Sequence, residues 1–366
     1  MVFLTFIFLI LPFSILDYGK KSFNVIVLQR YLFLCCLIYF IVVAGGRYYP
    51  GTGDWDSYRN IFLASGRIGN LFLFGYFEPG FELLINIIKT FTNVFNVFLL
   101  INELIVCVFL YYNIKIYLGN PISVCCLYFP IIFLTLDMIQ IRSLLAVQIF
   151  VFSMQFIRKR KLIPYCLCIF CASMVHISSL ILFPLYFVLH KKYKSNTLFF
   201  IVIIGILINI LRIDVFIPLV RIFAPLMGGT ISNRVAFYLS GTNLQRRIGF
   251  IHLEYLVFFP LIIRYRKKLE EYDINSNIFI NMFILYGIAI FYLWSFSVFS
   301  GRIKFFFIFS MLFLIPRLIK INKKIFLFVF FCFLGYVLAM VIYVLYFQSG
   351  LGASGFFSNY VNYFFM

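Results

Sequence analysis

Long apolar runs, separated by short lysine-rich loops, dominate this sequence. Hydrophobic residues make up 64% of its 366 positions, more than a water-soluble domain can bury. The lengths of the runs predict an all-α fold, a polytopic bundle of about twelve transmembrane helices in a single integral membrane domain, 1–366. We expect the spans at 2–16, 25–44, 94–112, 121–137, 141–157, 162–175, 177–189, 197–217, 251–263, 277–294, 303–316 and 325–347, with 162–189 readable also as one bent element.

The charged residues predict how this bundle is oriented. Lysines gather in five loops, a pattern typical of the cytoplasmic side of a bacterial inner membrane: residues 20–21, 158–161, 191–194, 264–268 and 317–324. If the chain starts outside, every one of these loops lies inside. Segments 45–93 and 218–250 and the tail from Gln348 then face the periplasm, with an amphipathic helix expected at about 80–92. Arginines, carboxylates and a histidine lie on this periplasmic side, where we therefore expect the function.

Composition also argues against several classes of protein. The net charge of +19 lies mostly in loops too short to form a nucleic-acid-binding domain, so anionic lipid headgroups are the better partner. The nine cysteines lie in apolar segments without polar neighbours, as packing residues do, and we expect no metal site among them. The first run lacks a cleavage site and is interpreted as a retained span.

The first periplasmic segment holds one base, acids and aromatic rings within a few positions. Arg47 precedes a Gly-Thr-Gly turn, and Asp54, Trp55, Asp56 and Tyr58 follow it. Carboxylates bind sugar hydroxyls and rings cover the apolar sugar face, so these residues are candidates for sugar binding. The spacing of Asp54 and Asp56 also suits a divalent cation or a turn stabilised by aspartate side chains.

Further candidates lie near the ends of the expected spans. Glu78 precedes Pro79 and is either a helix-capping acid or a catalytic one. Arg142 begins a span, where a charge needs a partner or a ligand, and Asp137 is one candidate partner. His176, flanked by serines, is a candidate proton acceptor. Glu103 lies in mid-span, where we expect an interhelical hydrogen bond.

Arginines of later segments lie on the same predicted side. They are Arg234 (with Tyr238), Arg246, Arg247 and Arg302. A guanidinium binds phosphate with a planar two-pronged fork, so these arginines suit an anionic headgroup. The alternative is that they extend toward lipid phosphates without further function.

Taken in order, these motifs resemble the EpsG-type branch of the Wzy oligosaccharide-repeat polymerases. The similar parts, spread over roughly 40–320, are Arg47 with the loop that follows, the Glu-Pro-Gly-Phe of 78–81, Arg142 with Ala146, His176 with its serines, and Gly301-Arg302 before a phenylalanine run. One departure is Ser143, where that family often has glutamine.

The resemblance implies polymerisation of lipid-linked repeat units on the periplasmic face. The hydroxyl of one unit, carried on undecaprenyl diphosphate, attacks the first sugar of the growing chain, which leaves its own undecaprenyl diphosphate. Undecaprenyl-diphosphate-linked oligosaccharides and membrane lipids are thus the expected partners, a chain-length regulator is a further candidate, and no cofactor is needed.

On this basis we assign roles to the candidate residues. A diphosphate clamp of Arg142, Arg234 and Arg302 is expected, assisted by Arg47 or by Arg246 and Arg247. His176 is the first candidate for the general base, with Asp54 or Glu78 as alternatives. Trp55, Asp56, Tyr58 and Tyr238 would bind substrate. An O-antigen ligase and a flippase for the same lipid-linked unit are the rival functions, and the sequence does not identify the sugars.

Overall fold

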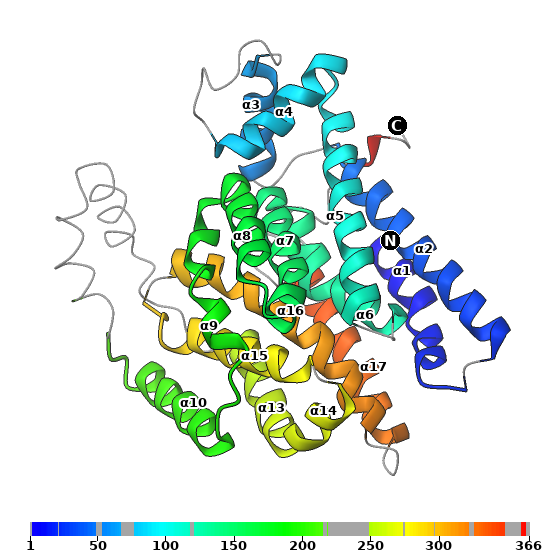
Figure 1. Cartoon of the computed structure of the whole chain (residues 1–366). Coiled ribbons are helices and arrows are strands. Elements are labelled where there is room, and N and C mark those ends of the chain that lie inside the picture. Colours follow the sequence, from blue (N-terminus) through cyan, green and yellow to red (C-terminus); the bar gives the residue numbers. More distant parts are fainter. Residues whose placement is uncertain are drawn as a thin grey trace. The chain divides into compact units, whose positions relative to one another are not determined.

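In the computed structural model, helices make up nearly all of the regular structure in the described part of the chain (Figure 1). The structure describes residues 2–20, 22–48, 53–66, 77–117, 121–214, 218, 249–273, 275–295, 297–321, 326–347 and 360–363. Extended pairing within these ranges is limited to an isolated antiparallel bridge between Arg47 and Asn362. The predicted all-α class is therefore confirmed.

Two compact units make up the chain, and the second is inserted in the sequence of the first. Unit 1 comprises Met1–Phe183 and Asn322–Met366, and unit 2 comprises Pro184–Ile321. The helices of unit 1 are α1 (Val2–Ile10), η1 (Pro12–Asp17), α2 (Phe23–Gly45), α3 (Gly53–Ala64), α4 (Pro79–Phe91), α5 (Phe95–Tyr117), α6 (Pro121–Tyr128), η3 (Phe129–Asp137), α7 (Ile141–Arg158), α8 (Leu162–Val175), η4 (Ile177–Leu182), α17 (Phe326–Ile342) and η7 (Tyr343–Phe347). Those of unit 2 are α9 (Leu185–Leu189), α10 (Ser195–Ile210), α13 (Phe250–Arg264), α14 (Arg266–Tyr272), α15 (Ser276–Phe291) and α16 (Ser297–Ile321).

Three helices are long and apolar enough to cross a membrane, among the residues that could be searched: α2, α5 and α7. Shorter apolar helices cover 2–17, 121–137, 162–175, 195–210, 276–291 and 330–346. The count of about twelve spans is thus not confirmed. The expected span 177–189 is broken, since η4 ends at Leu182 and a short helix starts at Leu185. Pro184, which has no backbone N–H, lies at this break.

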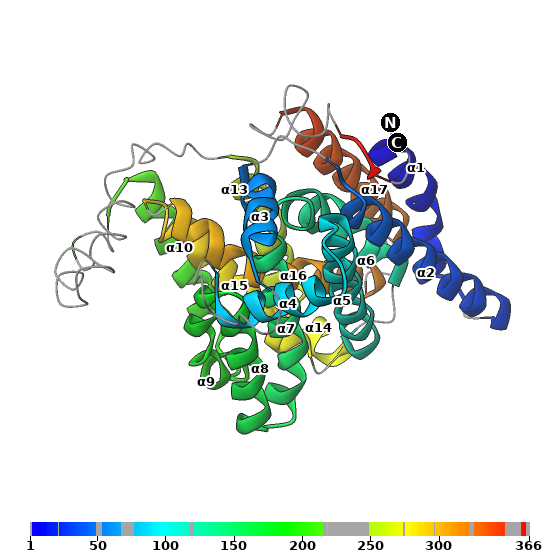
Figure 2. The same cartoon turned by 90° about the horizontal axis from the view of Figure 1, so that it is seen from above.

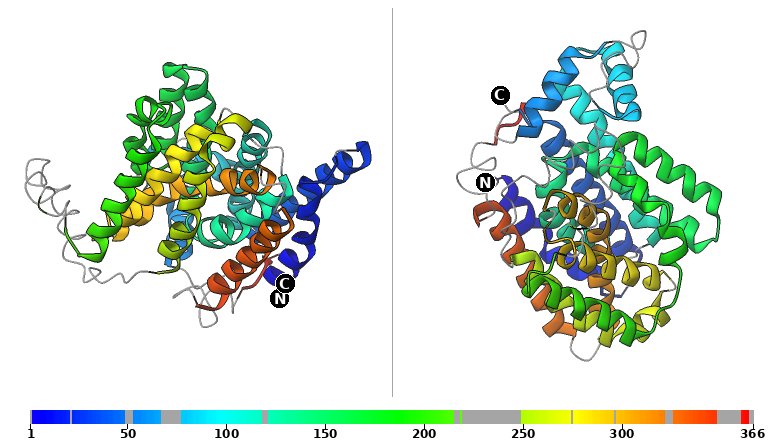
Figure 3. Two further views of the ribbon diagram at one scale, coloured as in Figure 1. Left: turned by 90° about the horizontal axis from the view of Figure 1, so that it is seen from below. Right: turned by 90° about the vertical axis from the view of Figure 1, so that its left-hand side faces the viewer.

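Within unit 1, residues at the C-terminal end of α2 form hydrogen bonds with the tail at 360–363. The tail closes against the end of α2 through Tyr48 N–H to Val361 O (2.9 Å) and Asn362 Nδ2 to Val42 O (3.0 Å). The start of α1 joins them, because the ring of Phe3 lies 5.0 Å from that of Tyr360. Figure 2 and the left-hand view of Figure 3 show α1 near this tail, in agreement with the ring contact.

The helices of unit 1 run back and forth between this end and an opposite, lysine-bearing end. At the opposite end, Asp17 accepts a hydrogen bond from Ser123 N–H (2.7 Å), and Tyr117 donates one to Val151 O (3.0 Å). The loop between α7 and α8 holds the basic residues 158–161, while His176 follows the other end of α8. Lysine loops and the arginine–carboxylate residues of unit 1 therefore lie at opposite helix ends, as the alternation of spans predicts.

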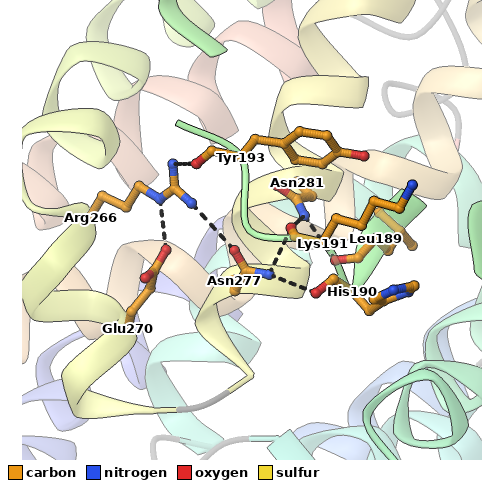
Figure 4. A network of polar contacts seen from close by, with 8 residues as sticks. All are labelled: Leu189, His190, Lys191, Tyr193, Arg266, Glu270, Asn277 and Asn281. Carbon is orange, nitrogen blue, oxygen red and sulfur yellow. Dashed lines mark hydrogen bonds and ion pairs between the residues drawn. The ribbon is translucent and has the colours of Figure 1, made fainter. Parts of the chain in front are cut away.

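In unit 2, a polar network fixes the backbone of the lysine-rich loop after α9 (Figure 4). Asn281 on α15 donates to Leu189 O and Lys191 O, both at 2.8 Å, and the Asn277 amide donates to Lys191 O at 3.1 Å. Arg266 on α14 donates to Tyr193 O and pairs with Glu270. The network supplies donors to backbone carbonyls that the short helix leaves open, and the side chains of Lys191, Lys192 and Lys194 are exposed.

Candidate active site

Three side chains from different helices of unit 1 meet at the helix ends opposite the basic loop 158–161. Glu78 precedes α4, Arg142 lies in the first turn of α7, and His176 follows α8. Arg142 Nη1 lies 2.6 Å from Glu78 Oε2, and His176 Nδ1 lies 3.4 Å from Oε1 of the same carboxylate. Ile177 N–H also donates to Oε1, at 3.1 Å. We call these three side chains the Glu78 cluster; one carboxylate holds both a guanidinium and an imidazole.

The sequence Glu-Pro-Gly-Phe explains why α4 presents its carboxylate here. Pro79 is at the first helical position, where a missing N–H is harmless. Glu78 is the N-cap residue, yet its side chain makes no capping hydrogen bond and is directed to Arg142 instead. Gly80 lies against α8: an added Cβ would come within 2.8 Å of Met174 Cβ. Only glycine lets the start of α4 approach α8 this closely.

Aromatic rings cover the Arg142 guanidinium. Its Cζ lies 4.0 Å from the centroid of the Phe77 ring, 5.7 Å from that of Tyr58 and 6.0 Å from that of Phe81. Arg142 Nε also donates to Tyr58 Oη at 3.4 Å. Ring faces attract cations and exclude water, so these rings and the Glu78 carboxylate fix the guanidinium while 22% of the Arg142 side chain stays accessible.

The environment of Glu78 keeps its carboxyl ionised. Burial alone would raise its pKa, but the His176 hydrogen bond, the Arg142 charge and the Ile177 N–H together lower the pKa to about 2. A carboxylate with so low a pKa is a poor proton acceptor at neutral pH. Glu78 is therefore suited to orient its partners.

Among the sugar-binding candidates that follow Arg47, Tyr58 reaches the cluster through its hydroxyl. Trp55 is buried in α3, with its ring edge-on to Phe95 at 5.4 Å, and Asp56 on the same helix is exposed. The backbone of Asp54 belongs to α3, and its side chain lies outside what the structure describes. The structure thus joins Tyr58 to Arg142, and it leaves Asp56 exposed.

Arg47 does not lie in the Glu78 cluster. It is buried at 2% exposure, donates to Ala44 O, and interacts electrostatically with Glu103 and Asp137. Asp137 accepts a hydrogen bond from Tyr128 Oη at 2.6 Å, whereas Arg142 pairs with Glu78. The nearest acid in sequence is therefore not the partner of Arg142.

The structure does not place the remaining predicted arginines relative to this cluster. Arg302 lies in α16 of unit 2 and is partly exposed. The others lie outside the described residues: Arg234, Tyr238, Arg246 and Arg247. Their roles remain predictions.

Sequence reasoning missed several groups that shape the site. Phe77 directly precedes Glu78 and makes the closest ring contact with Arg142; the proximity to the Glu-Pro-Gly-Phe motif was the available signal. The serines beside His176 were noted in the sequence, but not the contact of Ser178 Oγ, which lies 3.3 Å from His176 Nε2. Lys89 on α4 donates to the carbonyls of Phe62, Leu63 and Ser65 at the end of α3, which joins α3 to α4.

Comparison with known protein families matches residues 30–363 to the EpsG family. Nothing matches among curated proteins or among solved structures. The match includes all three members of the Glu78 cluster. Together with the apolar helices, it identifies a membrane protein.

Proposed function

Because the chain belongs to the EpsG family, a Wzy-like polymerase family, we propose that it polymerises oligosaccharide repeat units linked to undecaprenyl diphosphate. The reaction would take place on the periplasmic face of the bacterial inner membrane, the side opposite the lysine loops. The observation that carries this proposal is the Glu78 cluster. It combines a guanidinium packed against aromatic rings, which can bind a diphosphate, with an imidazole oriented by Glu78, which can accept the proton of a hydroxyl group.

His176 is the proposed general base. Its Nδ1 faces the Glu78 carboxylate, which favours the tautomer with the proton on Nδ1 and leaves the Nε2 lone pair for a substrate hydroxyl. Ser178 Oγ lies 3.3 Å from Nε2. The substrate hydroxyl would either take the place of the Ser178 hydroxyl beside Nε2 or accept a hydrogen bond from it. The ionised Glu78 would also stabilise the imidazolium that forms when the proton arrives.

Arg142 is the proposed contact to the leaving diphosphate. Its Nη1 and Nε are engaged by Glu78 and Tyr58, and Nη2 has no hydrogen-bond partner within the described ranges. Both N–H groups of Nη2 thus remain for phosphate oxygens. Arg234, Arg302, Arg246 and Arg247 stay in the proposal as further clamp residues, while the burial of Arg47 favours an indirect role for it.

The bond changes follow from these positions. The acceptor hydroxyl oxygen forms a bond to the anomeric carbon of the growing chain, and its proton passes to His176 Nε2. The bond from that carbon to the diphosphate oxygen breaks, and the electron pair leaves with the undecaprenyl diphosphate. Arg142 faces the charge that develops on this leaving group, and the lipid tails hold both substrates in one plane.

The test is a gel of surface polysaccharide from a strain that lacks this gene. The strain is complemented with wild type, with Arg142→Ala, with His176→Ala, or with Arg264→Ala, which removes an exposed arginine outside the cluster. A polymerase predicts long chains for wild type and Arg264→Ala and a single repeat unit for the other two, at equal protein level.

Other outcomes identify the rivals. Long chains that remain on undecaprenyl diphosphate without attachment would indicate a ligase. Repeat units that accumulate on the cytoplasmic side would indicate a flippase. Wild-type chain lengths in Arg142→Ala would remove Arg142 from the mechanism.

A further inference from the structure

A second group of charged side chains is buried among the helices of unit 1. Arg47 follows the end of α2, Glu103 lies on α5, and Asp137 ends η3; their exposures are 2%, 1% and 0%. The Arg47 charge interacts with both carboxyls. Glu103 lies in a helix long and apolar enough to cross the membrane, where an ionisable side chain is costly and points to a function.

The contacts between the two acids require a hydrogen atom. Asp137 Oδ2 accepts from Tyr128 Oη at 2.6 Å, and Glu103 Oε1 accepts from Cys107 Sγ at 3.5 Å. Asp137 Oδ1 is buried without a donor among the described residues, and the Glu103 and Asp137 carboxyls are in hydrogen-bond contact. Two carboxylates only accept, so this contact forms when one of the two acids is protonated.

The charge balance leads to the same conclusion. Two carboxylates and one guanidinium would leave an unpaired negative charge in a low-dielectric interior, which is strongly unfavourable. The other titratable groups that interact with these three are neutral acids: Tyr58, Cys107, Tyr128 and Tyr360. None of them supplies a second positive charge, whereas a single proton makes the group neutral.

We propose that Glu103 and Asp137 form a proton-binding site, in which the two carboxyls share one proton beside Arg47. The ligand is the proton itself, and the site does not depend on the proposed function. Arg47 is the counter-charge of this pair, and the tail bridge from Asn362 holds its backbone. The burial of Arg47 and the orphaned Asp137 oxygen thus have one common explanation.

Infrared spectroscopy of the full chain in lipid tests the shared proton directly. Wild type at neutral pH is expected to show a protonated-carboxyl C=O band that shifts on exchange into heavy water. Glu103→Gln and Asp137→Asn each remove that band, because the remaining acid then pairs with Arg47 as a carboxylate. A band that is missing in wild type, or that persists in both variants, overturns the proposal.

Substitutions that change the charge balance give an independent readout. Glu103→Gln and Asp137→Asn each leave one carboxylate for Arg47, so each is expected to accumulate in the membrane to within about twofold of wild type. The double variant leaves Arg47 unpaired and should accumulate about tenfold less. Adding Arg47→Gln to the double variant restores neutrality and should restore the amount of protein in the membrane. Equal levels of all four variants would show that no charge balance exists.

Discussion

Substitution of Glu78 by glutamine is the most informative single change, because it removes one charge and keeps the shape. The lowering of the Glu78 pKa from its ordinary 4.5 to about 2 corresponds to at most about 3 kcal/mol. The Glu78 and Arg142 side chains are 15% and 22% exposed, so water screens part of their attraction. We therefore expect Glu78→Gln to lower the free energy of unfolding by about 2 kcal/mol at neutral pH.

The pH dependence of this loss follows from the direction of the shift. A carboxyl whose folded-state pKa is lowered contributes stability above its unfolded pKa, and this contribution disappears as the pH falls through the folded pKa. The relevant window runs from about pH 4.5 down to about pH 2. Wild type and Glu78→Gln should thus differ most at neutral pH and less at about pH 3, as measured by thermal unfolding of the purified protein in lipid.

Activity should fall further than stability. Glutamine leaves His176 without its anionic partner, and we expect a loss of polymerisation rate of about 100-fold or more. Glu78→Asp, which keeps the charge, serves as the control for geometry. The reasoning is refuted if Glu78→Gln polymerises at the wild-type rate, or if its stability deficit is the same at about pH 3 as at neutral pH.

Three further substitutions test the packing around the cluster. Arg142→Lys should make no more than short chains on a polysaccharide gel, because an ammonium group cannot serve Glu78, Tyr58 and a diphosphate in one plane; wild-type lengths would mean that charge alone suffices. Gly80→Ala places a methyl group 2.8 Å from Met174 Cβ. This should lower the unfolding temperature, because the overpacking costs about 1–3 kcal/mol of stability. The control Gly335→Ala has nothing within 4 Å of its new methyl group and should leave the unfolding temperature unchanged. Lys89→Met removes the donor to three carbonyls at the end of α3, so limited proteolysis should cut the 53–66 region faster, at a cost of about 1 kcal/mol; unchanged cleavage would show that α3 is held by its rings alone.

The sequence predicted the local structure around the site well. The amphipathic helix expected at 80–92 is α4, Pro79–Phe91, because amphipathicity and a first-turn proline are local signals. His176 lies between the two helical segments α8 and η4. A hydrogen bond from Tyr165 Oη on α8 to Leu182 O on η4 (2.6 Å) holds these segments together. That Glu78, Arg142 and His176 lie at the same helix ends agrees with the predicted alternation of helices and loops.

The pairing of the site residues was beyond the reach of the sequence. Glu78 and Arg142 are 64 positions apart, and knowing that two residues share one side of a membrane does not say which of them touch. Proximity in sequence suggested Asp137 for Arg142, but Tyr128 and Glu103 hold Asp137. The number of spans is not confirmed for a different reason: apolar runs of intermediate length suit a buried helix as well as a membrane helix.

The placement of unit 2 within the sequence of unit 1 has a consequence for synthesis. Residues 360–363 hydrogen-bond to the end of α2, yet the ribosome makes all of Pro184–Ile321 in between. The carbonyls of Val42 and Val43 therefore lack their tail partners until the inserted unit has been synthesised. Reporter fusions are a common way to map topology. A fusion made anywhere between 184 and 321 would lack the tail, so it would report on a first unit without these hydrogen bonds.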